Sequence, residues 1–460
     1  MCGLIGISNH EEAAKASFLG LYALQHRGEE SAGIASYDGR EMYIVKNPGL
    51  VADALNEKSL NKLKGKTAIG HCRYSTTGSS NFKNIQPFFV IHKNRSIAVA
   101  HNGNLTNTEE LYQHLEEEGS IFQTSMDSEV IVHLLARSKN RDLKKWIVDV
   151  LSQLEGAFSL IFLIEDVIVG ARDMQGFRPL SLGKVGKSYI LASESCAFDL
   201  INAKFIREVE PGEIVIIRGE KIESFFLPGQ SKEKRSHCIF ENIYFARPDS
   251  HIFDGNVYIA RKYLGKQLAR EHPVDADYVM PIPDSGNYAA LGYAQESGLP
   301  FEIGMIRNHY IGRTFIQPTQ LVRDFSVKVK LNPIRDILKG KRIVVVEDSI
   351  VRGTTGKGRV EALRKAGAKE IHMRISCPPI KFPCFYGIDF PSSEELIASN
   401  KKIKEIADFI KVDSLEYLSL EGMLSVMKNS DNFCHACFTG KYPVKIPKNK
   451  SKYLMEGRKN

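Results

Sequence analysis

Short apolar segments separated by polar residues dominate the first 230 residues of the chain. Segments of strand length lie at residues 97–100, 159–163 and 214–217, and segments with helical spacing lie at residues 11–24 and 127–137. Strands and helices in this mixture are typical of packed sheets covered by helices. A polar, turn-prone stretch at residues 228–236 follows them. We therefore predict a first, α+β domain over residues 2–230.

After this stretch the pattern changes to strands that alternate with helices. Helical spacing is found at residues 257–270 and 288–295, and strand-like apolar runs are found at residues 278–282 and 342–346. Such alternation predicts βαβ units and a parallel sheet. We predict a second, α/β domain over residues 238–440, followed by a basic tail at residues 441–460.

The run at residues 342–355 carries the clearest candidate chemistry. Two carboxylates, Glu347 and Asp348, stand where a buried strand ends, and Gly353 follows shortly before a helical pattern. Backbone N–H groups at a helix N-terminus bind phosphate, and open parallel sheets bind their ligands at this edge. The pattern predicts a phosphate and sugar site. The alternative is an ordinary strand followed by an acidic turn.

A second signal lies at the start of the chain, which reads Met1-Cys2-Gly3. Removal of the initiator methionine would make Cys2 N-terminal and place its own α-amine within reach of its thiol. An α-amine has an unperturbed pKa near about 8 and can accept the thiol proton, as an N-terminal nucleophile requires. The alternative is a small buried residue at the start of a strand, because free cysteine is often buried.

Composition narrows the class of protein. A chain of 460 residues with 43% hydrophobic content suits two globular domains. It begins with no cationic segment followed by a long apolar one, so we expect a cytoplasmic protein without a membrane span. Residues 441–460 contain seven Lys or Arg and one Glu, which accounts for most of the net charge of +8. We therefore expect no nucleic-acid binding. Eight cysteines in a protein expected in the cytoplasm indicate thiols or metal ligands rather than disulfides.

Polar motifs follow Cys2 in a fixed order. They are His26-Arg27-Gly28-Glu29-Glu30-Ser31, Gly70-His71-Cys72-Arg73-Tyr74-Ser75 and His101-Asn102-Gly103-Asn104. With these motifs the first half resembles the glutaminase domain of the N-terminal-nucleophile (Ntn) amidotransferases, which is an αββα sandwich. Relatives usually have Gln where this chain has Glu29. That change alters a charge without removing a catalytic group.

The resemblance implies roles for five residues. Cys2 attacks the glutamine amide, and the Asn102 side chain and the Gly103 N–H stabilise the oxyanion. Arg73 binds the carboxylate of glutamine and Asp127 binds its ammonium group. The alternatives are a tight turn at Asn102-Gly103 and surface ion pairs for the two charged residues.

The second half resembles the type I phosphoribosyltransferases, which have a Rossmann-like parallel sheet and bind phosphoribosylpyrophosphate (PRPP). Its further motifs are Tyr244-Phe245-Ala246-Arg247-Pro248-Asp249-Ser250 and Pro283-Asp284-Ser285-Gly286. Together the two halves resemble the amidophosphoribosyltransferase family. The resemblance implies the first step of de novo purine (IMP) biosynthesis. Glutamine, PRPP and water would give 5-phosphoribosylamine, pyrophosphate and glutamate, with ammonia channelled from Cys2 to the PRPP site.

The same resemblance assigns the second site. PRPP would bind to Asp348, Ser349, Ile350, Val351, Arg352, Gly353, Thr354 and Thr355, and one Mg²⁺ per subunit would lie at Ser285, Glu347 and Asp348. The family usually has Asp where Glu347 stands, so this carboxylate reaches one methylene further. A lid would start at Gly312. Its Arg313, Lys328 and Lys330 are candidates to cover pyrophosphate, with solvated loop charges as the alternative.

Four cysteines remain to be explained, namely Cys238, Cys384, Cys434 and Cys437. Spacing alone leaves zinc, an iron–sulfur cluster and a redox pair open. The segments at residues 382–389 and 437–443 resemble the iron–sulfur branch of the family, which implies a [4Fe-4S] cluster on these four residues. We expect Cys72, Cys196 and Cys377 to lie in the core.

The resemblance further implies purine-nucleotide inhibitors and a homo-oligomer, a tetramer in relatives. A glutamine-dependent sugar-phosphate aminotransferase or an asparagine synthetase would share the first domain but lack residues 347–355. A non-enzymatic, nucleotide-sensing relative would be expected to lack Cys2 or the phosphate loop. The remaining alternative is a glutaminase whose second site has lost its activity, and only the replacement of Asp by Glu347 suggests it.

Overall fold

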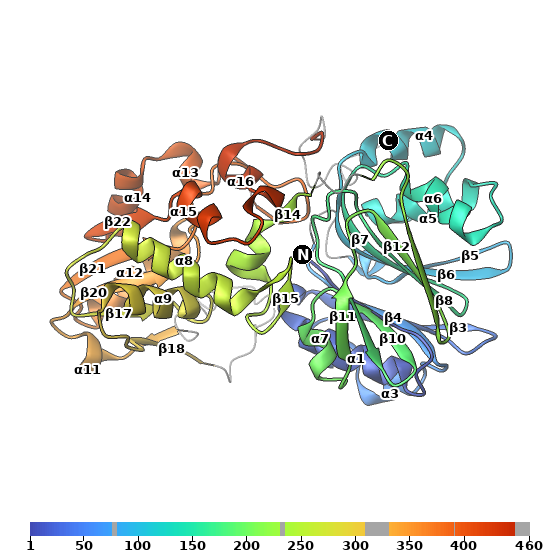
Figure 1. Ribbon diagram of the computed structural model, residues 1–460, viewed down its shortest axis with the longest axis horizontal. Coiled ribbons are helices and arrows are strands. Elements are labelled where there is room, and N and C mark those ends of the chain that lie inside the picture. Colours follow the sequence, from blue (N-terminus) through green and yellow to red (C-terminus); the bar gives the residue numbers. More distant parts are fainter. Residues whose placement is uncertain (76–80, 231–234, 309–330, 391, 447–460) are drawn as a thin grey trace.

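The computed structural model describes residues 1–75, 81–230, 235–308, 331–390 and 392–446. Its elements form two halves, which lie side by side in Figure 1. The N-terminal half contains two stacked antiparallel sheets with helices outside them, and the C-terminal half contains a parallel sheet with helices around it. The N-terminus lies at the boundary between the halves in Figure 1. Among the described helices, none has the length and hydropathy needed to cross a membrane.

The first sheet has seven strands in the order β11-β9-β10-β1-β4-β2-β3. Its strands are β1 (Gly3–Ile7), β2 (Ser31–Tyr37), β3 (Met42–Pro48), β4 (Thr67–Arg73), β9 (Ser181–Val185), β10 (Ser188–Ala192) and β11 (Lys204–Glu208). The helices on its outer side are α1 (Ala13–Ala23), α2 (Val51–Ala54), α3 (Glu57–Leu60) and α7 (Cys196–Asp199). Because β1 lies in the middle of this sheet, the start of the chain is held on both sides.

The second sheet has six strands in the order β13-β12-β8-β7-β6-β5. Its strands are β5 (Phe88–His92), β6 (Arg95–Leu105), β7 (Gly156–Ile164), β8 (Val167–Arg172), β12 (Glu213–Arg218) and β13 (Lys221–Phe226). The helices on its outer side are α4 (Thr108–Glu117), α5 (Asp127–Arg137) and α6 (Leu143–Leu151). Buried side chains such as Leu4, Ile161 and Leu191 fill the space between the two sheets. The result is the αββα arrangement that the sequence predicts.

The main sheet of the C-terminal half is parallel, with the order β17-β20-β21-β22. Its strands are β17 (Tyr278–Pro281), β20 (Arg342–Glu347), β21 (Glu370–Ile375) and β22 (Ser414–Tyr417). The longer helices around it are α8 (Val257–Glu271), α9 (Asn287–Ser297), α12 (Thr354–Lys365) and α14 (Ile403–Ile410). The strands and helices expected in this half are confirmed, because apolar strands alternate with amphipathic helices as the sequence pattern requires.

Short elements complete the C-terminal half. They are β14 (His237–Cys238), η3 (Glu241–Phe245), β15 (His251–Ile252), β16 (Gly255–Asn256), β18 (Met305–Arg307), β19 (Leu331–Pro333), α11 (Arg335–Leu338), α13 (Ile397–Asn400), α15 (Leu420–Ser425), β23 (Phe433–Cys434) and α16 (Ala436–Thr439). Of these, β14 pairs in parallel with β23, so residues close to the boundary between the halves contact residues close to the end of the described chain.

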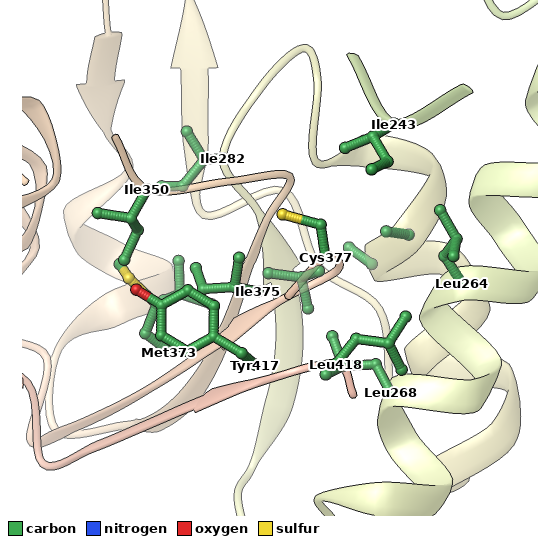
Figure 2. Close-up of a cluster of buried hydrophobic side chains, with 14 of the residues drawn as sticks. Ile243, Leu264, Leu268, Ile282, Ile350, Met373, Ile375, Cys377, Tyr417 and Leu418 are labelled. Carbon is green, nitrogen blue, oxygen red and sulfur yellow. The ribbon is translucent and has the colours of Figure 1, made fainter. Parts of the chain in front are cut away.

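One apolar cluster anchors the loop that follows β20. Figure 2 shows Ile350 of this loop together with Met373 and Tyr417, with Leu264 and Leu268 of α8 further along the same cluster. Ile350 is only 4% exposed. Burying such a side chain contributes roughly 1.5–3 kcal/mol to the stability of the fold. Ile350 therefore anchors the middle of the loop to the apolar core.

Candidate active sites

Cys2 lies immediately before the central strand β1. Its backbone N–H donates to Oδ1 of Asn102 over 3.0 Å, and its thiol donates to the Tyr74 carbonyl over 3.5 Å. The register pairs Gly3 with Cys72, which places Cys2 next to Arg73 at the end of β4. Asn102 belongs to β6 of the other sheet. The first candidate site therefore lies at one end of the sandwich, between the two sheets.

Asn102 and Gly103 lie inside β6, opposite Ser159 and Phe158 of β7. The tight turn considered as an alternative for this pair is therefore wrong. Gly103 has φ +150°, and a Cβ atom there would come within 2.0 Å of the Ala157 carbonyl, so only glycine fits. Within the described structure, Nδ2 of Asn102 is buried and has no hydrogen-bond partner. A buried amide donor without a partner is costly and indicates a site for a ligand acceptor.

The two residues predicted to bind glutamine are both buried near this site. Arg73 is the last residue of β4, and Asp127 is the first residue of α5. Oδ2 of Asp127 accepts the Leu105 N–H over 3.1 Å, and its Oδ1 lies 3.5 Å from Nδ1 of His101. Burial opposes the charge of Asp127, but His101 and the hydrogen bonds hold the pKa of this carboxyl below its ordinary value. The site thus keeps an anion that can bind an ammonium group.

The structure retains Met1, whose side chain is buried among residues of the C-terminal half. Its α-amine lies 3.5 Å from the Tyr74 carbonyl, and burial lowers the pKa of this amine to about 6. Cys72, the other thiol nearby, is fully buried, and burial raises its pKa to about 12. Because the thiolate is the reactive form, Cys72 is inert, which agrees with the core position expected for it.

A cluster of four buried charged residues lies next to the Cys2 backbone, and sequence reasoning assigned none of them a role. Arg27 donates to the Cys2 carbonyl over 2.9 Å and also binds Glu194 and Glu241. Arg178 lies 3.5 Å from Glu241. All four side chains are 0% exposed, and their charges balance. Arg27 stands in a motif that the sequence singles out, but its partners are too distant in sequence to be recognised from it.

The second candidate site lies at the carboxyl end of β20. Gly353 has φ +78° and precedes α12, so a glycine is favoured where the loop turns into the helix. Thr354 and Thr355 form the first turn of α12, whose N–H groups face the loop. Arg352 projects away and pairs with Glu395 over 2.7 Å. The loop thus turns directly into a helix N-terminus, the local structure that the sequence predicts.

The three residues predicted to hold magnesium come from two neighbouring strands. Ser285 follows β17, while Glu347 and Asp348 end β20, and the two strands pair in parallel. Burial raises the pKa of Asp348, although hydrogen bonds from Ser285 and Ser349 oppose the rise. Glu347 is bound by Arg359 of α12, a contact that sequence reasoning missed. The lid residues Arg313, Lys328 and Lys330 lie outside the described residues.

The four remaining cysteines meet at the junction of the halves. Cys238 and Cys434 are paired in the β14–β23 register, and Cys437 lies in α16. Burial raises the pKa of Cys437, and the nearby Cys238, Cys384 and Cys434 raise it further. Over the described ranges, no three His, Cys, Asp or Glu side chains lie close enough to hold a single metal ion. All eight cysteines are free, and Cys196 and Cys377 are buried as expected.

The segment after Cys384 connects this cysteine group to the first site. The Phe385 carbonyl accepts the Asn104 side chain over 3.0 Å, and the Tyr386 carbonyl accepts Nε of Arg178 over 2.9 Å. A Cβ atom on Gly387 would come within 3.0 Å of the Gly103 backbone. The C-terminal half therefore packs directly against the strand that carries Asn102 and Gly103.

Comparisons with known proteins agree with this arrangement. A family described as "Glutamine amidotransferase domain" matches residues 71–199. The amidophosphoribosyltransferase of Bacillus subtilis is 50% identical over 453 residues, which cover 97% of this chain and 94% of that protein. The chain belongs to the amidophosphoribosyltransferase family. The amidophosphoribosyltransferase of Methanocaldococcus jannaschii is 48% identical and covers 97% of this chain and 98% of its own length.

Solved structures of this family have the same fold. One, titled "Structure of the allosteric regulatory enzyme of purine biosynthesis", has a TM-score of 0.93 at 48% identity and covers 98% of both chains. Another is the B. subtilis PRPP amidotransferase in complex with ADP and GMP, with a TM-score of 0.91 at 48% identity and coverage of 97% and 98%. As an amidophosphoribosyltransferase, the chain transfers the amide nitrogen of glutamine to PRPP in purine biosynthesis.

Proposed function

We propose that Cys2, once Met1 is removed, is the nucleophile of the glutaminase reaction. Its α-amine accepts the thiol proton, and the sulfur attacks the glutamine amide to give a thioester and ammonia. Water then releases glutamate. The observation that carries this proposal is Asn102, whose Oδ1 holds the Cys2 nitrogen at 3.0 Å while its buried Nδ2 has no partner in the described structure. Nδ2 and the Gly103 N–H are the donors for the oxyanion.

Glutamine is held by Arg73 and Asp127 in this proposal. An Arg fork matches a carboxylate with two parallel hydrogen bonds, and the lowered pKa of Asp127 keeps it charged for the ammonium group. Both side chains are buried, 3% and 6% exposed, so their charges act in a medium that screens them weakly. The surface ion pairs considered as alternatives would be exposed, which does not fit this burial.

The ammonia then replaces pyrophosphate at C1 of the ribose. Residues 348–355 bind PRPP, with the N-terminus of α12 at the 5-phosphate. The C1–O bond to pyrophosphate breaks as the C1–N bond forms, so positioning and charge stabilisation do most of the work. Ser285, Glu347 and Asp348 fit Mg²⁺, which binds through few carboxylates and takes its other ligands from substrate oxygens. When bound, Mg²⁺ neutralises charge on the leaving pyrophosphate.

The four cysteines at the junction fit a [4Fe-4S] cluster. Each iron of such a cluster takes one thiolate, so the four ligands surround a body larger than one ion. Cys238, Cys384, Cys434 and Cys437 lie close enough to interact electrostatically, as the four ligands of one cluster would. Burial raises the pKa of the Cys238 and Cys437 thiols, and a bound cation would favour their deprotonation. The role of the cluster is structural, because its four ligands connect the two ends of the C-terminal half.

Purine nucleotides are the proposed inhibitors, since a relative has been seen with ADP and GMP. We also propose that the chain forms a homo-oligomer, a tetramer by its resemblance to relatives. No residues are assigned to either property.

The test uses anaerobically purified protein with Mg²⁺ and PRPP, and follows pyrophosphate release with glutamine or with ammonium. Wild type should use both nitrogen sources, and Cys2→Ala should use ammonium alone. Cys72→Ala is the matched control, because this neighbouring thiol is buried and inert. If wild type forms glutamate but releases no pyrophosphate with either source, the proposed PRPP site is wrong.

A further inference from the structure

Glu347 and Arg359 form an ion pair in the wall of the PRPP site. Glu347 is the last residue of β20, and Arg359 lies in the second turn of α12. Nη1 of Arg359 donates to Oε1 of Glu347. The side chains are 8% and 23% exposed. The pair therefore joins the strand and the helix that enclose the phosphate loop.

Only one of the two carboxylate oxygens is used. Oε2 of Glu347 is buried and has no hydrogen-bond partner among the described residues, and the same is true of Nε of Arg359. A buried carboxylate oxygen without a donor costs free energy, and such an atom beside the phosphate loop indicates a ligand that supplies the missing contact. Ribose hydroxyls and Mg²⁺ are the groups that the proposed function brings to this position.

The second carboxylate of the loop is held in a different way. Asp348 accepts the Ser349 hydroxyl over 2.5 Å and also a hydrogen bond from Ser285. The two adjacent carboxylates thus differ in charge balance, because Glu347 is directly paired with a cation, whereas Asp348 is held by hydroxyl donors and is attracted by Arg261 without a direct ion pair. PRPP carries a pyrophosphate and a 5-phosphate. Neutralising one carboxylate reduces its repulsion of this polyanion.

We propose that Arg359 is a positioning residue for Glu347 in the PRPP site. It fixes Oε1, directs Oε2 towards the ribose and metal side, and lets this chain use Glu where the family usually has Asp. The longer side chain spans the distance to Arg359 and still presents one oxygen to the ligand. This inference rests on the proposed PRPP site and adds a residue, Arg359, that the family resemblance does not assign.

The experiment is a double-mutant cycle measured with ammonium as nitrogen source, so that glutamine chemistry plays no part. Arg359→Met keeps the length of the side chain and removes its charge, and Glu347→Asp shortens the carboxylate. We expect each single variant to lower kcat/KM for PRPP by about tenfold or more, with a higher Mg²⁺ requirement, because a buried charge loses its partner. The double variant should recover to within about threefold of wild type, because the Asp no longer needs Arg359.

Two controls separate positioning from folding. Arg364→Met removes another arginine of α12, which binds Asp413 rather than the loop, and should leave the KM for PRPP unchanged. Glutaminase activity without PRPP should be the same in every variant. Arg359→Lys keeps the charge and should restore part of the activity lost in Arg359→Met.

Three results would overturn the inference. They are wild-type kcat/KM in Glu347→Asp, wild-type kcat/KM in Arg359→Met, and losses in the double variant that equal the product of the single losses. If Arg359→Met fails to fold, kcat/KM for PRPP in Glu347→Asp alone tests the inference, since this variant keeps Arg359 in place. Failure of wild type to release pyrophosphate with ammonium would instead contradict the proposed function itself.

Discussion

Arg27 donates a hydrogen bond to the backbone carbonyl of Cys2 over 2.9 Å from a guanidinium group that is completely buried. The same guanidinium group makes two hydrogen bonds to Glu241, which belongs to the C-terminal half. The backbone of Cys2, the proposed nucleophile, is therefore held through a residue of the C-terminal half. This contact offers a route by which the two sites can influence each other.

The first prediction concerns Glu241→Gln. Loss of this charge leaves Arg27 with a weaker partner, so the Cys2 backbone is held less firmly. We expect glutamine-dependent pyrophosphate release to fall by about tenfold or more while ammonium-dependent release stays near wild type, together with a lower melting temperature, since breaking a buried pair costs about 3–5 kcal/mol. Both activities and the melting temperature should be measured on the same preparation.

Glu296→Gln is the control for Glu241→Gln, because Glu296 pairs with Arg270 at the surface. It should change neither activity. An equal loss of both activities in Glu241→Gln would show that the network supports only folding.

The second prediction concerns the oxyanion donor. Asn102→Ala removes Nδ2 and should lower glutamine-dependent kcat by about 10²–10³-fold, as expected for one such donor. Ammonium-dependent release should persist. Steady-state rates with each nitrogen source check this. Asn107→Ala is the control, since the Asn107 side chain binds the Gln153 carbonyl away from Cys2. Unchanged glutamine-dependent kcat in Asn102→Ala would assign the oxyanion to another donor.

The third prediction concerns His71 and pH. Burial lowers the pKa of His71 to about 3 from its ordinary value of 6.5. The unfolded chain binds a proton below pH 6.5 that the folded chain excludes, so stability falls as pH falls from 6.5 towards 3, by up to about 1.4 kcal/mol per pH unit. His71→Gln should flatten this fall in the melting temperature between about pH 6.5 and 5.

The exposed His114 provides the control for this measurement, because its side chain is 62% exposed. His114→Gln should leave the pH dependence unchanged. If His71→Gln and wild type lose stability in parallel over this range, His71 is protonated in the folded protein.

The fourth prediction concerns the cysteine group. Cys434→Ser should remove most of the iron from anaerobically purified protein and lower the melting temperature, because metal binding contributes directly to folding. Iron per chain and thermal unfolding measure the two effects. Cys196→Ser changes a buried thiol outside the group and should leave the iron content unchanged. Full iron content in Cys434→Ser would exclude Cys434 as a ligand.

The parts of the sites that the sequence predicts are those carried by local patterns. Residues 347–355 run without interruption from the end of a strand through a loop into a helix, and Cys2 directly follows the initiator methionine. The two carboxylates and Gly353 therefore could be recognised without a structure. The order of the strands could also be expected once the family resemblance was established, because relatives share it.

The missed residues are charged side chains with distant partners. Glu241 is more than 200 residues from Arg27, and in a sequence it looks like any solvated glutamate. Arg359 would have been easier to predict, because the second turn of a helix that follows a βα loop lies near the end of the preceding strand. Its partner Glu347 departs from the family pattern, and such a departure is a reason to search the following helix for compensation.

The pairing of β14 with β23 also has a consequence for the order in which the protein is made. Cys238 and Cys434 are adjacent in space but about 200 residues apart in the chain, so closing this loop carries a large entropic cost. During synthesis Cys238 leaves the ribosome long before Cys434 and Cys437 exist. The cysteine group is therefore incomplete until nearly the whole chain has been made. A nascent or truncated chain that ends before Phe433 would contain Cys238 and Cys384 but lack the other two cysteines of the group.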